Sequence, residues 1–77
     1  MSSMFYFHNG QTADSIKTLI KVLETLDEET FRYHCNKDKN DFYNWLNTGL
    51  NDAKAAAGIK ALKTKKAILT KLKQLKY

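Results

Sequence analysis

The sequence predicts an all-α fold, a compact bundle of four to five short helices that follows a short extended aromatic segment at the N-terminus. Apolar residues recur at helical spacing along most of the chain. Residues that cap helices well precede these apolar runs. Proline is absent and glycine occurs only three times, so little in the sequence interrupts a helix.

Length and composition indicate one folded domain over residues 1–77. A chain of this size buries roughly 60% of its unfolded surface, and two separate cores would each be too small to be stable. With 43% hydrophobic and 27% charged residues, the composition is that of a globular protein rather than a disordered tail.

The N-terminal segment, residues 4–8, is rich in aromatic side chains and is expected to be extended. Asn9-Gly10 follows it and is typical of a turn. The polar residues 11–15 do not resemble a returning strand, so no β-hairpin is expected. The aromatic side chains are expected to pack against the helices instead.

The first two helices follow good capping residues. Ser15 begins the first, whose apolar residues form one stripe at spacings of three and four: Ile16, Leu19, Ile20, Leu23 and Leu26. Asp27 caps a second, shorter helix in which Phe31 shares a face with His34 or Cys35. The polar run after this helix is expected to be a loop.

Three further helices are expected in the second half of the chain. Asn40 caps the third, and Gly49 is expected to end it in the left-handed conformation. An alanine-rich fourth helix follows residue 51 or 52 and runs to Leu62. Thr64 caps the last helix. The inward side chains of the third and last helices are Phe42, Trp45, Leu46, Ile68, Leu72 and Leu75.

Two blocks of residues carry a resemblance to a known family. They read Phe5-Tyr6-Phe7-x-x-Gly10 and His34-x5-Asn40-Asp41-Phe42-x-x-Trp45. With these blocks in this order, the chain resembles, over nearly its whole length, a small archaeal family of helical domains of unknown function. One departure is a leucine-alanine pair usual in the fourth helix, which here reads Ala55-Ala56. The resemblance implies a fold and no activity.

Few residues could support catalysis or metal binding, and they are His8, His34, Cys35, Asp38 and Asp41. Zinc sites generally need about four ligands, with paired Cys or His residues at short spacing, and this chain has one Cys and two His. Cys35 and His34 are adjacent and point about 100° apart on a helix, so they cannot form a nucleophile pair. We expect neither a metal, a cofactor nor enzymatic activity, and interpret His34 as a partly buried residue that bonds to a backbone carbonyl or to the start of the third helix.

The third-helix block also has a structural interpretation. Asn40 is a helix cap, and Asp41 in the first turn favours the positive end of the helix dipole. Phe42 and Trp45 could stack on nucleobases, but their helical spacing favours a place in the core.

Charge is distributed very unevenly along the chain. Residues 1–50 carry a net charge of −2, and residues 51–77 carry +7. A helical projection places four lysines on one flank of the last helix, with two more just before it. This predicted basic ridge consists of Lys60, Lys63, Lys65, Lys66, Lys73 and Lys76. Clustered lysines suit the phosphate backbone of DNA or RNA without reading sequence, although a charged helix face also keeps a small domain soluble.

Another class of function remains open from the residues. The chain could be a protein-protein interaction module or a small homodimer that uses exposed surface around Phe5, Phe7 or Tyr43. The lone cysteine, the absence of a hydrophobic signal core near Met1 and the lack of an apolar stretch near 20 residues predict a cytoplasmic protein without a membrane partner.

Overall fold

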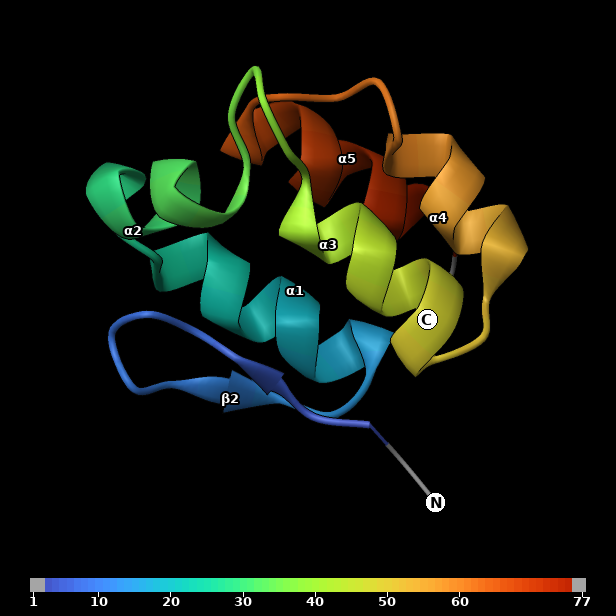
Figure 1. Cartoon of the computed structure of the whole chain (residues 1–77), viewed down its shortest axis with the longest axis horizontal. Helices are drawn as coiled ribbons and strands as arrows, with labels where there is room; N and C mark the ends of the chain where they lie inside the picture. The colour runs from blue at the N-terminus through green and yellow to red at the C-terminus, as the bar shows by residue number, and fades with distance from the viewer. Residues whose placement is uncertain (1–2, 76–77) are drawn as a thin grey trace.

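A computed structural model describes residues 3–75 of the chain. Its elements are a two-stranded β-hairpin, five α-helices and a π-helical turn, η1, which continues the third helix (Figure 1). Their bounds are β1 (Phe5–Tyr6), β2 (Thr12–Ala13), α1 (Ile16–Thr25), α2 (Glu28–His34), α3 (Asp41–Asn44), η1 (Trp45–Gly49), α4 (Ala53–Ile59) and α5 (Lys65–Gln74). The helix-rich fold predicted from the sequence is confirmed, with 59% of residues helical. No helix within residues 3–75 combines the length and the apolar character needed to pass through a membrane.

The prediction that no hairpin forms is wrong. β1 and β2 pair antiparallel, with Phe5 opposite Ala13. The Gly10 N–H donates to the Phe7 carbonyl at 3.0 Å, and the Phe7 N–H donates to the Gln11 carbonyl at 2.8 Å. Gly10 has φ of 96°, which makes this a three-residue loop with a left-handed glycine at the bulge position rather than a two-residue turn. A strand of two residues, of which only Ala13 is buried, is enough to form the second side of the hairpin.

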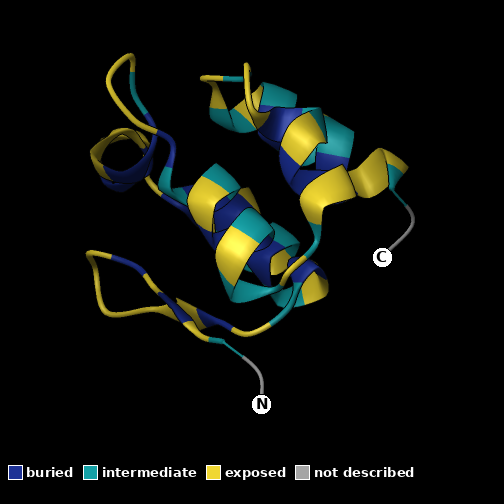
Figure 2. Cartoon of the chain, turned by 45° about the vertical axis from the view of Figure 1, so that its right-hand side comes forward, coloured by how far each residue is buried: buried dark blue, intermediate teal, exposed yellow. Residues whose placement is uncertain are grey.

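The helices form a bundle around one core, and the hairpin lies against α1. In Figure 1 the hairpin runs below α1, while α5 and α4 occupy the upper part of the molecule. α1 packs against both α5 and β2, and α4 packs against α3 and α5. Buried residues lie on the inward faces of these elements and exposed residues on the outward faces (Figure 2).

Side-chain caps fix the start of every α-helix. The cap side chains accept hydrogen bonds from backbone N–H groups three residues ahead. Four of the caps are predicted from the sequence. For α4 the sequence predicts a start after residue 51 or 52, and the cap is Asp52. The five capping residues are Ser15, Asp27, Asn40, Asp52 and Thr64.

The centre of the core is a set of stacked aromatic rings. Phe42, fully buried on α3, has the ring of Phe5 at 5.0 Å and the ring of Phe31 at 5.7 Å between centroids. Phe7 and Trp45 are also buried, with 4% and 7% of their surface exposed. The expectation that the N-terminal aromatics pack against helices is therefore confirmed for Phe5 and Phe7 but not for Tyr6, which is exposed. The expectation that Phe42 and Trp45 belong to the core is confirmed.

The prediction that Gly49 ends the third helix in the left-handed conformation is wrong. The left-handed residue is Asn51, with φ of 55°, and Gly49 lies inside η1. There, the Leu50 N–H donates to the Trp45 carbonyl at 2.9 Å, which closes the wider turn. A Cβ atom on Gly49 would lie 2.5 Å from Cδ1 of Trp45, so this position needs glycine for space rather than for its φ angle.

Candidate nucleic-acid interface

Two lysines of the predicted ridge face α1 and have partners there. The Lys73 ammonium lies 2.9 Å from a carboxylate oxygen of Glu24, near the end of α1. The Lys65 ammonium donates a hydrogen bond to the backbone carbonyl of Leu26, just after α1. The part of the predicted flank that carries Lys65 and Lys73 therefore lies beside α1. Lys76 lies outside the described residues.

The other three lysines of the ridge lie at the junction of α4 and α5. Lys60 caps the end of α4, and its ammonium lies 5.7 Å from the centre of the Tyr43 ring. Lys63 is in the connection, and Lys66 is in the first turn of α5. Both side chains are exposed. Within residues 3–75, none of these three ammonium groups has a carboxylate within 4.0 Å.

Lys71 joins this group, although it is not part of the predicted basic ridge. Its side chain leaves α5 on the side opposite α1 and lies over Gly58 of α4, where an added Cβ would be 3.1 Å from Lys71 Cε. No carboxylate of the described residues lies within 4.0 Å of its ammonium group either. The only sequence signal for this contact is Gly58 itself, a glycine inside an alanine-rich helix. We call Lys60, Lys63, Lys66 and Lys71 the junction lysines.

The connection that carries the junction lysines is tied to the centre of the fold. α4 ends at Ile59 rather than at Leu62 as predicted, because the chain turns with the Leu62 N–H bonded to the Ile59 carbonyl at 3.0 Å. The side-chain amide of the buried Asn40 donates to both of these residues' carbonyls, at 3.2 Å to Ile59 and 3.4 Å to Leu62. The Cys35 thiol also contacts the Leu62 carbonyl, at 3.6 Å. Lys60 and Lys63 therefore project from an anchored backbone.

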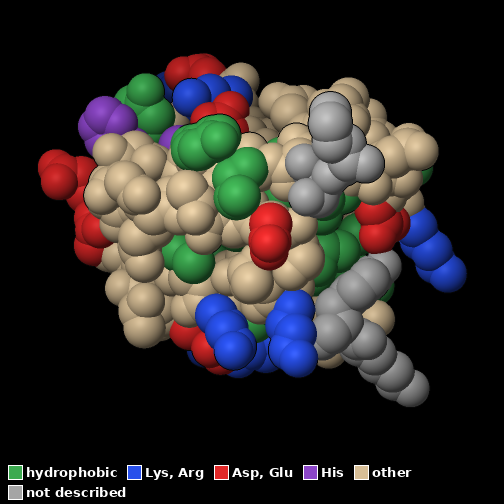
Figure 3. All heavy atoms as spheres, turned by 90° about the horizontal axis from the view of Figure 1, so that it is seen from below, with side chains coloured by type: hydrophobic (Ala, Val, Ile, Leu, Met, Phe, Trp, Pro, Cys, Tyr) green, Lys and Arg blue, Asp and Glu red, His purple; other side chains and the backbone are tan. Residues whose placement is uncertain are grey.

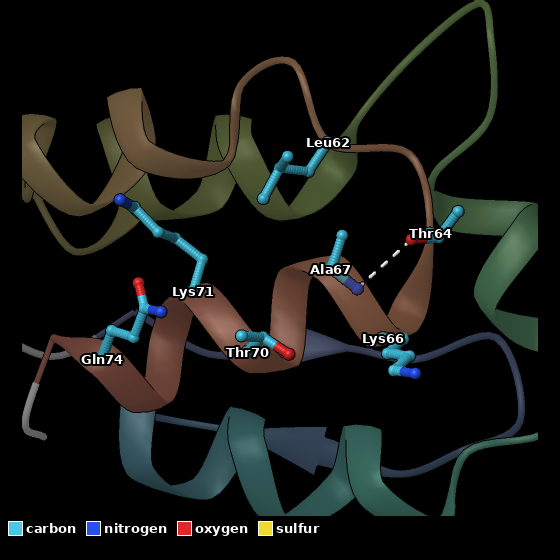
Figure 4. A pocket seen from close by; sticks show the side chains of 7 residues that line it. All are labelled: Leu62, Thr64, Lys66, Ala67, Thr70, Lys71 and Gln74. Carbon is cyan, nitrogen blue, oxygen red and sulfur yellow. Dashed lines mark hydrogen bonds between the residues drawn. The ribbon is translucent and has the colours of Figure 1, made fainter.

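A shallow groove of about 450 Å³ runs along α5 beside this connection (Figure 4). Leu62 descends into it from the connection, and Ala67 points up toward Leu62 from α5. Lys66 and Lys71 extend toward opposite ends of the view. The lining residues are Leu62, Thr64, Lys66, Ala67, Thr70, Lys71 and Gln74.

The first turn of α5 adds positive potential to the groove. Thr64 Oγ1 accepts the Ala67 N–H at 3.2 Å, and no acidic residue lies in the first turn. A helix N-terminus carries the positive end of the dipole, where cations such as Lys66 are unfavourable and anions are favourable. The Lys66 ammonium and the positive end of the helix dipole therefore lie together at the start of α5.

His34 and Asp41 form a second polar cluster, but its imidazole is fully engaged. Nδ1 of His34 lies 3.1 Å from a carboxylate oxygen of Asp41, and Nε2 accepts the backbone N–H of His8 at 2.9 Å. Lys39 contacts the same carboxylate at 3.1 Å. His34 is 5% exposed and contacts the start of the third helix, as interpreted from the sequence, although its second partner is a backbone N–H and not a carbonyl. Its Nε2 lone pair is occupied and cannot act as a general base in this conformation.

The remaining candidates for chemistry lie apart from that cluster. Cys35 is 1% exposed, and burial raises the pKa of its thiol, which keeps the sulfur protonated. His8 stacks on Tyr33 with 4.1 Å between ring centroids. In the part of the chain that the structure describes, no three His, Cys, Asp or Glu residues lie close enough together to hold a metal ion.

The apolar surface differs from the one expected for protein interaction. Phe5 and Phe7 are buried, which removes them as contact residues, and Tyr43 is half-buried. The large hydrophobic side chains that are exposed in residues 3–75 are Met4, Tyr6 and Tyr33, at 42%, 72% and 50%. Hydrophobic side chains reach the surface beside a histidine when the molecule is seen from below (Figure 3).

Comparison with known proteins adds no relative. No family model, curated protein or solved structure matches this chain. The resemblance to the small archaeal family stays a prediction.

Proposed function

We propose that this chain is a non-enzymatic binding domain that contacts the phosphate backbone of nucleic acid without reading its sequence. One observation carries the proposal: the four junction lysines have no carboxylate partner among the described residues, whereas Lys73 pairs with the Glu24 carboxylate and Lys65 donates to the Leu26 carbonyl just after α1. Ammonium groups without carboxylate partners on neighbouring elements favour an anionic partner, because binding releases the counterions condensed on phosphates.

The kind of cation supports backbone contact over base reading. All four side chains are lysines, whose ammonium groups act as point charges on flexible stems. Base edges are usually read by the planar forks of Arg, Asn or Gln. The sole arginine, Arg32, lies on α2 and pairs with Glu28 at 3.4 Å.

The backbone of the junction keeps the cations close together. Lys60 and Lys66 are six residues apart, so even an extended chain would separate their Cα atoms by at most about 21 Å. A nucleic-acid duplex presents a phosphate charge about every 1.7 Å along its axis. Several phosphates of one duplex therefore lie within reach of the junction at once.

A salt titration of duplex DNA binding tests the proposal. If all four junction lysines neutralise phosphates, the logarithm of affinity falls against the logarithm of salt concentration with a slope of about −3.6. The double variant Lys63→Gln/Lys66→Gln should reduce this slope to about −1.8 and weaken binding of unrelated sequences alike.

The matched control is Lys17→Gln/Lys21→Gln, which removes the same charge from exposed positions on α1. This control should change the slope far less than the junction variant. If both variants reduce the salt slope equally, the DNA is attracted to the overall charge of the domain, which would contradict a site at the junction. No binding at low salt would remove the proposal.

A second candidate function is protein interaction or self-association, favoured by the exposed Tyr6 and Tyr33. Large exposed hydrophobic side chains can serve as contacts for a partner. Light scattering at increasing protein concentration tests self-association. A mass that rises with concentration, and falls back to that of a monomer in Tyr6→Ser, would support it. A constant monomer mass would exclude the homodimer.

A further inference from the structure

We propose that the groove on α5 holds the base and sugar of one unstacked nucleotide, so that this domain prefers single-stranded nucleic acid to duplex. The inference rests on the proposed function and adds the class of ligand. Three features of the groove support the inference: its place between two junction lysines, its apolar floor and its free hydrogen-bonding groups.

The charges of the groove lie at its two ends. Lys71 crosses toward α4, with its stem over Gly58, and Lys66 lies toward the opposite end of the view in Figure 4. Consecutive phosphates of a single strand flank each nucleoside on both sides. A cation at each end of the groove matches that arrangement, and neither cation has a carboxylate partner in the described residues.

The floor between the two cations is apolar. Leu62 and Ala67 are only partly buried, and they face each other across the groove. The groove measures about 450 Å³, within the range of roughly 300–1,000 Å³ typical of sites for small organic ligands. A flat base laid on this floor would remove apolar surface from water, which phosphate contact alone does not do.

Polar groups without partners stand beside this floor. The Gln74 amide and the Thr70 hydroxyl are exposed, and neither side chain has a hydrogen-bond partner within residues 3–75. Gln74 is the single amide in the lining, and a glutamine amide can donate to and accept from the edge of a base. Thr64, in contrast, uses its hydroxyl to cap α5.

A duplex cannot use these features. Its bases are paired and stacked inside, so it would present only phosphates and would leave the floor and Gln74 open to water. A single strand can turn one base out of its stack at little cost, which a paired duplex cannot do. The groove should therefore give single-stranded nucleic acid a higher affinity than duplex, although the lysines attract both.

The test compares four fluorescein-labelled probes by anisotropy at fixed salt. They are an oligothymidylate of about 15 nucleotides, an abasic strand of equal length and charge, a duplex of that length and a polyglutamate peptide. Because the base covers apolar surface in the groove, the wild-type chain should bind oligothymidylate about tenfold more tightly than the abasic strand, and more tightly than the duplex.

Ala67→Leu fills the groove without changing charge. It should lower affinity for oligothymidylate to that for the abasic strand and leave abasic binding unchanged. The matched control, Ala57→Leu, makes the same change at an exposed position of α4 and should keep the tenfold preference. Thermal unfolding of both variants verifies that they fold. A milder change on the exposed surface, Gln74→Ala, should also reduce the preference for oligothymidylate over the abasic strand.

The outcomes separate this inference from the proposed function. Equal binding of oligothymidylate and abasic strand, or tighter binding of the duplex, would overturn the nucleotide site and leave backbone binding intact. Failure of all three nucleic acids to bind would overturn the proposed function, and the nucleotide site with it. Tighter binding of polyglutamate than of oligothymidylate would assign the groove to an acidic protein partner instead.

Discussion

The backbone N–H of His8 donates to Nε2 of His34 at 2.9 Å, across 26 residues of sequence. The bond fixes the tautomer, because a nitrogen that accepts cannot also carry a hydrogen, and it places the hydrogen of neutral His34 on Nδ1, facing Asp41. It also satisfies a backbone N–H at the turn of the hairpin. His34 therefore joins the hairpin to the start of α3.

His34→Phe should destabilise the fold while keeping an aromatic ring of similar size. The variant leaves the His8 N–H and the Asp41 carboxylate without this partner, and we expect a loss of about 1–3 kcal/mol in the free energy of unfolding. Urea denaturation measures it, and faster hydrogen exchange at the His8 amide should accompany it. His8→Ala is the control, since it keeps the backbone N–H, and an equal loss there would contradict the role assigned to His34.

Gly49→Ala should destabilise the chain by about 1–3 kcal/mol, because the new methyl group would overlap the indole of Trp45. Gly58→Ala is the contrasting variant. Its methyl group meets only the flexible end of Lys71, and alanine favours a helix over glycine by about 1 kcal/mol. Thermal unfolding should therefore rank Gly58→Ala at or above wild type and Gly49→Ala below it. Similar effects at both positions would disprove the steric argument.

The cap of α2 should make stability depend on acid pH. The Asp27 carboxylate accepts two hydrogen bonds from Thr30, one from its backbone N–H at 2.9 Å and one from its hydroxyl at 2.7 Å. These bonds hold the pKa of Asp27 below its usual range. The pKa is lower folded than unfolded, so the ionised cap stabilises the fold above the unfolded pKa. This contribution is lost as pH falls through the folded pKa, below about pH 4.

Asp27→Asn keeps a capping side chain that does not titrate. The difference in Tm between wild type and this variant should be greatest near neutral pH and should shrink as pH falls toward about 2. Melting curves at several pH values measure the difference. A difference that does not vary with pH would show that the charge of Asp27 adds nothing to its cap.

Cys35 should react slowly with thiol reagents. Burial raises the pKa of its thiol, and Asp41 adds to the effect while Lys63 opposes it. Since the thiolate is the reactive form, modification of folded protein at pH 8 should be on the order of a hundredfold slower than in denaturant. A disulfide reagent that releases a coloured product gives both rates. Comparable rates would mean that the loop between α2 and α3 opens readily.

Glu24→Gln should strengthen binding of nucleic acid, if the proposed function holds. The change releases Lys73 from its partner and removes a negative charge beside α5. The salt slope should steepen by up to about 0.9, for one more phosphate contact. The exposed ion pair contributes below about 1 kcal/mol to stability, so the variant should remain folded. An unchanged slope would place Lys73 outside the nucleic-acid interface.

Most of the helical fold could be predicted because local sequence determines it. Ser15, Asp27, Asn40 and Thr64 cap helices through their own side chains, and the apolar spacing shows which face turns inward. The hairpin was missed for a physical reason. Its return strand has two residues and almost no pattern, and the contacts that hold it come from distant groups such as His34.

The candidate site was only partly predictable for a similar reason. A helical projection shows which lysines share a flank, but not which neighbouring helix covers that flank. α1 covers the side with Lys65 and Lys73, while Lys71, on the other side, is positioned by Gly58 of α4. Such contacts between helices depend on tertiary packing, which the periodicity of one segment does not reveal.

The stacking of Phe42 between Phe5 and Phe31 has a bearing on how the chain folds as it is synthesised. Phe5 is synthesised before Phe42, and the ring it packs on belongs to α3, which leaves the ribosome only after β1, β2, α1 and α2. An N-terminal fragment that stops before α3 would expose its aromatic residues to water and to chaperones. Folding of this core should thus wait for α3 and occur in one cooperative step.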